Sequence, residues 1–191
     1  MNNDPIEQFR RLYNEAEKTL PEPDAMVLST VDEDGSPSGR FVLLKAVDGH
    51  GFVFYTNLSS RKARALIANP RAALCFYWPT INKQIRVEGV VERVSDAEAD
   101  EYFSSRPRES QIGAWASAQS DTLPSRQLLE DRVADVRKRF EGKPVTRPEF
   151  WSGFRVVPGV IEFWTRDAAR LHHRERFSRL GERWVPELLY P

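Results

Sequence analysis

The sequence predicts a mainly β protein with inserted helices, arranged as a mostly antiparallel barrel. Short runs of β-branched and aromatic residues, separated by turn residues, occupy the first and last thirds of the chain. Helical patterns lie mainly between them, so strands and helices do not alternate and a doubly wound parallel sheet is disfavoured. About eight strands with short connections fit an antiparallel barrel better.

The length and composition indicate one globular domain. The chain has 191 residues, of which 40% are hydrophobic and 29% charged, which is enough to build one core and excludes wholesale disorder. We expect a single domain over residues 1–191. Its parts are an N-terminal helix and lead-in at 1–24, inserted helices at 95–141 and C-terminal strands at 150–191.

Local signals place the N-terminal elements. Ile6, Phe9 and Tyr13 recur at helical spacing and Pro21 follows, which predicts a helix over residues 5–20. Gly89 interrupts a long strand pattern and is a candidate β-bulge. The other elements expected here are strands at 26–31, 40–47, 52–56, 72–78 and 84–94, and a short helix at 61–68.

The second half begins with helical signals. Ser95 and Glu98 form a capping box that opens a helix ending near residue 105. A further helix is expected at 109–118, and the clearest one at 125–141. The apolar face of that last helix comprises Leu128, Leu129, Val133, Val136 and Phe140. The final strands are expected at 151–157, 160–164, 175–179 and 183–188, with a turn at Pro158-Gly159.

Charge and cysteine content exclude several classes. Lys plus Arg and Asp plus Glu both number 28, and this zero net charge disfavours a general nucleic-acid or membrane-surface binder. Cys75 is the single cysteine, so no intrachain disulfide is expected and a reducing compartment fits. No secretory signal or membrane-spanning run is recognisable, which predicts a cytoplasmic protein.

A serine-capped basic helix start is the first candidate site. The segment from Ser59 to Arg64 places three cations in the first helical turn, where the helix dipole disfavours positive charge. A bound phosphate would compensate them through free N–H groups and basic side chains. A solvated basic turn is the alternative, and the residues alone weigh the two evenly.

Three other clusters are weaker alone. The strand from Arg40 to Lys45 can lie along a flat ligand, or be an ordinary barrel strand with charged ends. Tyr102 and Arg106 share a helix face and Ser110 can cap the next helix, which suits a phosphate, although an arginine near a helix end is favourable by itself.

The third cluster holds His172 and His173. Adjacent histidines on a strand point to opposite faces, so they chelate poorly and no metal site is expected. A histidine in a ligand pocket and a histidine at the surface are equally compatible with this pattern.

In combination and order, these segments resemble the pyridoxamine 5'-phosphate oxidase family. The run from Ser104 to Trp115 and the triplet Arg170-Leu171-His172 are the most specific motifs. The resemblance extends from about residue 25 to 184. The other matching segments are 40–45, 54–57, 60–62, Gln84, 102–103, 119–120, 150–155 and 161–164.

The resemblance implies a split β-barrel homodimer with FMN at the subunit interface. It further implies an FMN-dependent oxidase that converts pyridoxamine or pyridoxine 5'-phosphate to pyridoxal 5'-phosphate and reduces O2 to H2O2. The implied FMN-binding residues are Arg40, Phe41, Val42, Leu43, Leu44, Lys45, Tyr55, Thr56, Arg61, Lys62, Gln84, Gln119, Ser120, Trp164 and Arg174. The implied substrate-binding residues are Lys45, Tyr102, Arg106, Ser110, Arg170 and His172, of which Arg170 and His172 orient the reacting carbon.

The chain departs from the family pattern in three places. It begins close to the first helix, without the basic, tyrosine-bearing arm of some members; His173 replaces an acid, and Leu188 stands where an arginine is common. Alternatives are a related FMN oxidase of the phenazine-pathway type, and a non-catalytic protein that carries FMN or pyridoxal 5'-phosphate. A nucleic-acid-binding barrel is disfavoured by the zero net charge.

Overall fold

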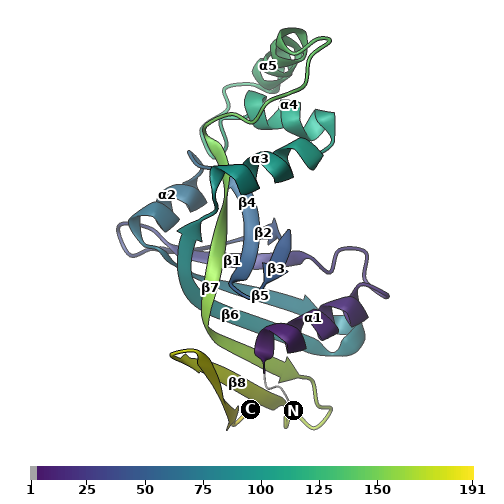
Figure 1. Ribbon diagram of the computed structural model, residues 1–191, viewed down its shortest axis with the longest axis vertical. Helices are drawn as coiled ribbons and strands as arrows, with labels where there is room; N and C mark the ends of the chain where they lie inside the picture. The colour runs from purple at the N-terminus through teal and green to yellow at the C-terminus, as the bar shows by residue number, and fades with distance from the viewer. Residues whose placement is uncertain (1–3) are drawn as a thin grey trace.

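The computed structural model describes residues 4–191, so the first three residues of the expected 1–24 segment lie outside it. Its strands form one antiparallel sheet that curls into a half-barrel (Figure 1), in the order β2-β1-β5-β6-β7-β4-β3, with β8 and β9 beyond β7. The strands are β1 (Ala25–Val31), β2 (Pro37–Leu43), β3 (Ala46–Asp48), β4 (Gly51–Asn57), β5 (Arg71–Trp78), β6 (Lys83–Arg93), β7 (Trp151–Thr165), β8 (His173–Leu180) and β9 (Arg183–Leu189).

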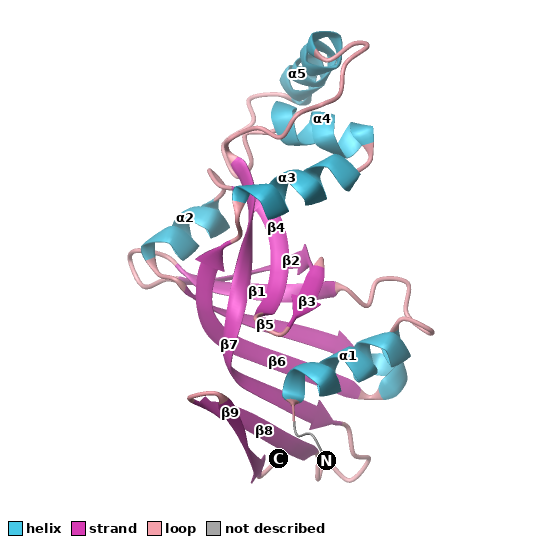
Figure 2. Cartoon of the chain, in the orientation of Figure 1, coloured by secondary structure: helices cyan, strands magenta, loops and turns pink. Residues whose placement is uncertain are grey.

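The helices divide between the sheet and one end of the molecule (Figure 2). The long helix-rich insertion stands beyond the end of the sheet where β7 begins, whereas β8 and β9 lie at the opposite end. None of the helices described in residues 4–191 is long and apolar enough to cross a bilayer. The helices are α1 (Pro5–Ala16), α2 (Arg61–Ala68), α3 (Asp96–Ser105), α4 (Arg108–Ala116) and α5 (Arg126–Arg139), with a short 3-10 turn at Pro79–Ile81.

Strand β7 is the longest strand and pairs with three others. One edge pairs with β6 from Phe154 to Thr165, while the other edge pairs first with β4 and then with β8. The turn expected at Pro158-Gly159 is therefore wrong, and residues 151–165 form one strand. The register of β6 and β7 shifts between Glu88 and Gly89, where a bulge was expected, but the extra residue is Gly159 of β7, because Glu88 lies opposite Val160 and Gly89 opposite Pro158. The irregularity accommodates a proline that has no N–H to donate.

The strand expected at 40–47 is also wrong, because it divides in two. β2 ends at Leu43 and β3 begins at Ala46. Between them, the Leu44 N–H donates to the Asp24 carbonyl and the Lys45 N–H to the Val53 carbonyl. The chain thus changes partner from β1 to β4, and Lys45 lies in the crossover.

Two hydrophobic clusters hold these elements in place. In the main core, Phe9 of α1 packs edge-on against Phe52 of β4 at 4.9 Å and Phe76 of β5 at 5.0 Å. A smaller cluster around Phe103 and Trp151 joins α3 and α4 to the start of β7.

Helix α5 differs from its expected packing. Its predicted apolar face is only partly covered: Phe140, just beyond its end, is buried, but no residue inside the helix is. The helix contacts α4 and lies away from the sheet (Figure 1), so it has too little surface to pack against.

Candidate functional site

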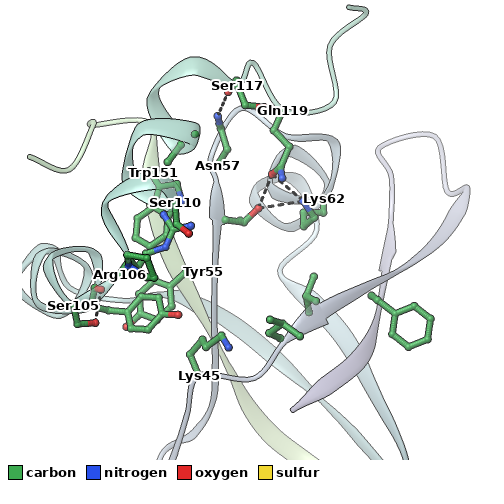
Figure 3. Close-up of a pocket in the computed structure, with 18 residues that line it drawn as sticks. Lys45, Tyr55, Asn57, Lys62, Ser105, Arg106, Ser110, Ser117, Gln119 and Trp151 are labelled. Atoms are coloured by element: carbon green, nitrogen blue, oxygen red, sulfur yellow. Dashed lines mark hydrogen bonds between the residues drawn. The ribbon is translucent and has the colours of Figure 1, made fainter. Parts of the chain in front are cut away.

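A cavity of about 700 Å³ lies where β2, β4 and β7 meet α3 and α4 (Figure 3). Three cations line it, namely Lys45, Lys62 and Arg106, and no aspartate or glutamate is among its lining residues. A site with this charge pattern binds anions. The lining residues are Phe41, Val42, Leu43, Lys45, Tyr55, Thr56, Asn57, Lys62, Tyr102, Ser105, Arg106, Pro107, Ser110, Gly113, Ala114, Ser117, Gln119 and Trp151.

Lys62 occupies one end of the cavity, in the first turn of α2. Ser60 caps this helix, and its Oγ accepts a hydrogen bond from the Ala63 N–H. The Lys62 Nζ donates to Thr56 Oγ1 and to Gln119 Oε1, both at 3.1 Å. Burial, together with repulsion from Arg40, lowers the pKa of Lys62. A cation with only neutral partners is poised to receive an anion at this end.

The neighbouring arginines are arranged differently. Arg61 pairs with Asp32 at 2.5 Å and does not line the cavity. Arg40 donates to the Leu28 carbonyl and to Thr30 Oγ1, and burial lowers its pKa, with Arg61 adding repulsion. Their assignment to FMN stays a prediction, and of the basic helix start Lys62 alone borders the cavity.

Arg106 occupies the other end of the cavity. Its guanidinium lies 4.8 Å from the centre of the Trp151 ring, and its pKa is lowered by burial. Its Nη1 is buried and has no hydrogen-bond partner within residues 4–191. Leaving such a donor unsatisfied costs on the order of 1–3 kcal/mol, so an acceptor bound here would be stabilised.

Ser110 and Tyr102 line the same end, although not in the expected way. Ser110 was expected to cap a helix, but α4 begins at Arg108, and Pro107 supplies no side-chain cap. Helix α3 ends at Ser105, so Arg106 is in extended backbone rather than on a helix face with Tyr102. Tyr102 and Ser110 nevertheless both line the cavity, because α4 begins directly after Pro107 and so lies close to the end of α3.

An aromatic wall lines the cavity beside Arg106. The Tyr55 ring stacks on Tyr102 at 4.0 Å and lies 5.4 Å from the parallel ring of Trp151. Gly153 permits this packing, since a Cβ there would lie 2.7 Å from the Tyr55 ring. Burial, with the nearby Glu98 charge, raises the pKa of Tyr55 to about 12, so its hydroxyl is protonated at neutral pH.

The remaining predicted residues gather at the far end of β7. Gln84 on β6 and Arg174 on β8 both lie opposite Trp164 of β7, and the Trp164 ring lies 4.5 Å from the His172 ring. Trp164 follows Trp151 by thirteen positions in the strand, which corresponds to about 40 Å along β7. The sequence-predicted residues thus fall into two half-sites at opposite ends of one strand (Figure 1).

The backbone and hydrogen bonds fix this second half-site. The His172 Nδ1 accepts from the Asp167 N–H at 3.1 Å, which leaves Nε2 to carry the proton of a neutral ring. Arg174 donates to the buried Glu162 carboxylate at 2.7 Å. Arg170 is exposed and has a positive φ of 67°, a conformation that non-glycine residues adopt at a cost of about 1 kcal/mol.

Two other predicted residues lie near the cavity without lining it. Ser120 is exposed, also has a positive φ of 78°, and follows the lining residue Gln119. Leu44 is buried in the main core. Their roles toward FMN stay predictions. Within the described residues, no cluster of three His, Cys, Asp or Glu side chains could hold a metal ion.

Sequence reasoning missed several lining residues. Trp151 carries the Arg106 guanidinium, and Asn57 donates to the Ser117 carbonyl at 3.2 Å, which joins the end of β4 to the segment after α4. Both residues stand inside motifs of the resemblance. An aromatic ring at a strand start and an amide before a capping serine were the available signals, but each is also common in structural positions.

Comparisons with known proteins agree with this arrangement. Residues 12–140 match the family model described as "Pyridoxamine 5'-phosphate oxidase". Residues 151–191 match "Pyridoxine 5'-phosphate oxidase C-terminal dimerisation region". The chain belongs to the pyridoxamine 5'-phosphate oxidase family. Membership confirms the family expected from the sequence, with FMN as the cofactor of that family and a dimerisation region at the C-terminus.

Individual relatives support the same conclusion. A pyridoxine/pyridoxamine 5'-phosphate oxidase of Myxococcus xanthus (strain DK1622) is 56% identical over 189 residues, covering 98% of this chain and 92% of that protein. The structure of PhzG from Burkholderia lata 383, in complex with tetrahydrophenazine-1-carboxylic acid, has a TM-score of 0.93 at 31% identity, covering 98% and 93% of the two chains. An FMN-binding protein from Nostoc punctiforme PCC 73102 shares the fold, with a TM-score of 0.80 at 16% identity over both full chains. The split-barrel fold expected from the sequence is confirmed.

The residues of the cavity fit FMN. A flat ring system suits the exposed side chains of β2 beside the aromatic wall, and a terminal phosphate suits Lys62, whose partners are uncharged oxygens. The cavity also retains Arg106 as a separate cation with an unsatisfied donor. One phosphate at Lys62 therefore leaves a second anion position at Arg106.

Proposed function

We propose that this protein is an FMN-dependent oxidase that converts pyridoxamine 5'-phosphate or pyridoxine 5'-phosphate to pyridoxal 5'-phosphate, with O2 reduced to H2O2. One observation carries the proposal: the cavity has three lining cations, no lining carboxylate, and a buried arginine donor that has no partner among the described residues 4–191. FMN and the substrate each end in a phosphate. Two separate anion positions account for both molecules.

At the cofactor position, Lys62 would contact the FMN phosphate, with Thr56 and Gln119 fixing the ammonium group. The strand residues Phe41 and Leu43 would cover the ring system. FMN, when bound, supplies the acceptor for a hydride from the substrate C4' and returns the electrons to O2. The protein contributes binding, orientation and charge matching, so no side chain has to act as a strong acid or base.

At the substrate position, Arg106 and Lys45 would hold the phosphate, with hydroxyl groups of Tyr102 and Ser110 beside them. The pyridine end would meet Arg170 and His172, which orient the reacting carbon. His172 offers a defined donor at Nε2, because its Nδ1 already accepts the Asp167 N–H. For the amine substrate, the oxidised imine hydrolyses with one water to the aldehyde and ammonia.

A homodimer would complete this site. Arg170 and His172 lie at the end of β7 remote from Arg106, so one chain does not provide a closed pocket by itself. Exposed apolar side chains occur in both regions: Phe41 is 75% exposed in the first, Leu171 and Leu188 are 72% and 71% exposed in the second. We place FMN at the interface, where the second half-site of one copy covers the cavity of the other.

Subunit complementation tests this interface. Arg106→Ala and His172→Ala homodimers should each have low activity, because both of their sites are damaged. Random mixed dimers would carry one intact site and one doubly damaged site, which restores about a quarter of all sites. Mixtures that stay as inactive as the parents would contradict the shared site.

The activity itself is tested by a visible spectrum of the purified protein and anaerobic addition of pyridoxamine 5'-phosphate. A flavin spectrum that bleaches and returns with air, with formation of an aldehyde, would support the oxidase. A stable flavin spectrum would point to another aromatic substrate, as in the phenazine-pathway branch, or to a carrier. Absence of flavin after addition of FMN would refute the proposal.

A cytoplasmic role in the formation of pyridoxal 5'-phosphate is part of the proposal. It rests on the single cysteine, Cys75, which suits a reducing compartment. This thiol is half-buried, and burial raises its pKa, so it is a poor nucleophile and takes no part in the site.

A further inference from the structure

The three cations of the cavity do not have equivalent partners. Lys62 donates only to neutral oxygens, and Arg106 makes no ion pair within residues 4–191. Lys45 differs, because its Nζ lies 2.8 Å from Asp24 Oδ2. Asp24 is outside the cavity lining, yet its carboxylate reaches a lining cation directly.

The backbone keeps Asp24 in this position. Its carbonyl accepts the Leu44 N–H at 2.8 Å, one residue before Lys45, at the point where the chain crosses from β2 to β3. The Lys45 N–H is in turn bonded to the Val53 carbonyl. Both side chains of the pair are partly shielded, with 26% of Lys45 and 22% of Asp24 exposed, so water screens the charge only partly.

An anion that binds beside Lys45 must therefore approach Asp24 as well. The carboxylate offsets the charge of Lys45 and repels a phosphate dianion within a few ångströms. Lysine has three donors, so it can contact both groups at once, but the repulsion between them stays. On electrostatic grounds, the pair should lower the affinity for an anion beside Lys45.

We propose that Asp24 sets the affinity of the substrate position by partly neutralising Lys45. Asp24 is a specificity-determining residue that touches neither FMN nor substrate and acts through Lys45. The inference rests on the proposed function, in which Lys45 and Arg106 hold the substrate phosphate. Substrate and product carry the same phosphate, so Asp24 weakens both and favours release of the product.

The test is steady-state kinetics of the FMN-loaded enzyme with pyridoxamine 5'-phosphate. Asp24→Asn should lower KM about fivefold to tenfold, because a repulsive charge near the dianion disappears. The inhibition constants of inorganic phosphate and pyridoxal 5'-phosphate should fall by a similar factor, while FMN affinity stays unchanged. Asp24→Glu, which keeps the carboxylate, should resemble the wild type.

A matched control is Glu109→Gln, which removes an acid from an exposed pair with Arg137 outside the cavity. It should leave KM and phosphate inhibition unchanged. An unchanged or raised KM in Asp24→Asn, with normal FMN binding, would overturn the inference. Wild-type protein that binds FMN without oxidising the substrate would instead overturn the proposed function, so the two failures are distinguishable.

Discussion

The two ends of β7 differ in shape and in how their charges are paired. Near Trp151 the sheet meets α3 and α4, which creates a concave site in which Lys62 and Arg106 have no anionic partner within residues 4–191. Near Trp164 the sheet continues into the β8–β9 hairpin, where Arg174 already pairs with the buried Glu162. The first half-site is recognisable in a single chain because it is hollow and electrostatically unsatisfied. The second is a surface whose charges are already paired, and in the proposed function it acts only against a second copy of the chain.

The largest expected effect comes from Arg106, whose substitution should change substrate binding and leave FMN binding intact. Arg106→Ala should raise KM for the phosphorylated substrate about 100-fold, because charge-assisted hydrogen bonds to a phosphate are lost. FMN should remain bound, since Lys62 is untouched. Steady-state kinetics with a flavin spectrum of the same sample measures both. Unchanged kinetics would remove Arg106 from the substrate position.

Substitution of the cations in α2 should affect the cofactor instead. Lys62→Ala should weaken FMN binding about 30-fold, because its charge faces the cavity among neutral partners. Arg61→Ala should weaken it by only about threefold, since this exposed arginine is already paired with Asp32. Titration of the apoproteins with FMN gives both constants. An opposite ranking would show that Arg61 leaves Asp32 when FMN binds.

The aromatic support of Arg106 offers a finer test. Trp151→Leu should raise the substrate KM about tenfold, since the guanidinium loses the ring on which it rests at 4.8 Å. Trp115→Leu is the matched control, because Trp115 carries Arg139 at 4.4 Å and does not line the cavity. Equal effects of the two variants on KM would reduce the role of Trp151 to general packing.

The smallest effect concerns the ionisation of Tyr55. Its pKa of about 12 in the folded protein lies above the ordinary tyrosine value of 10.0, so the folded state holds its proton more tightly. The contribution of Tyr55 to the free energy of unfolding is fully present below pH 10.0 and is lost as the pH rises toward about 12. Tyr55→Phe should flatten the fall in stability over this window, measured by denaturant unfolding at several pH values. An equally steep fall in the variant would assign it to other groups.

Much of the fold followed from local sequence signals. The capping serines Ser60 and Ser95 each accept a hydrogen bond from the first turn of their helix, as the patterns indicated, and Gly89 marks the bulge. The errors arose where long-range pairing prevails over local preference. Pro158-Gly159 looks like a turn in isolation, but Gly159 forms a bulge within β7 and the strand continues beyond it.

The site was predictable to a different extent. The serine-capped basic helix start predicts a phosphate from its charge pattern; Lys62 borders the cavity, whereas Arg61 and Arg64 do not, and the phosphate stays a prediction. The prediction that Tyr102, Arg106 and Ser110 lie together rested on the family motifs. The helix geometry expected for these residues differs from the one in the structure. The ion pair between Asp24 and Lys45 was not predictable, since it depends on a crossover between strands that sequence patterns do not reveal.

The continuity of β7 has a consequence for the length of the chain. Side chains alternate across a strand, so one inserted or deleted residue between Trp151 and Trp164 would reverse the facing of one half-site relative to the other. Pro158, paired with Gly89, and the bulge at Gly159 fix the register of β6 and β7, which opposes a compensating slide of the sheet. We therefore expect the number of residues between Trp151 and Trp164 to tolerate less change than the identity of the outward-facing residues. The length of β7 sets the distance between the two half-sites.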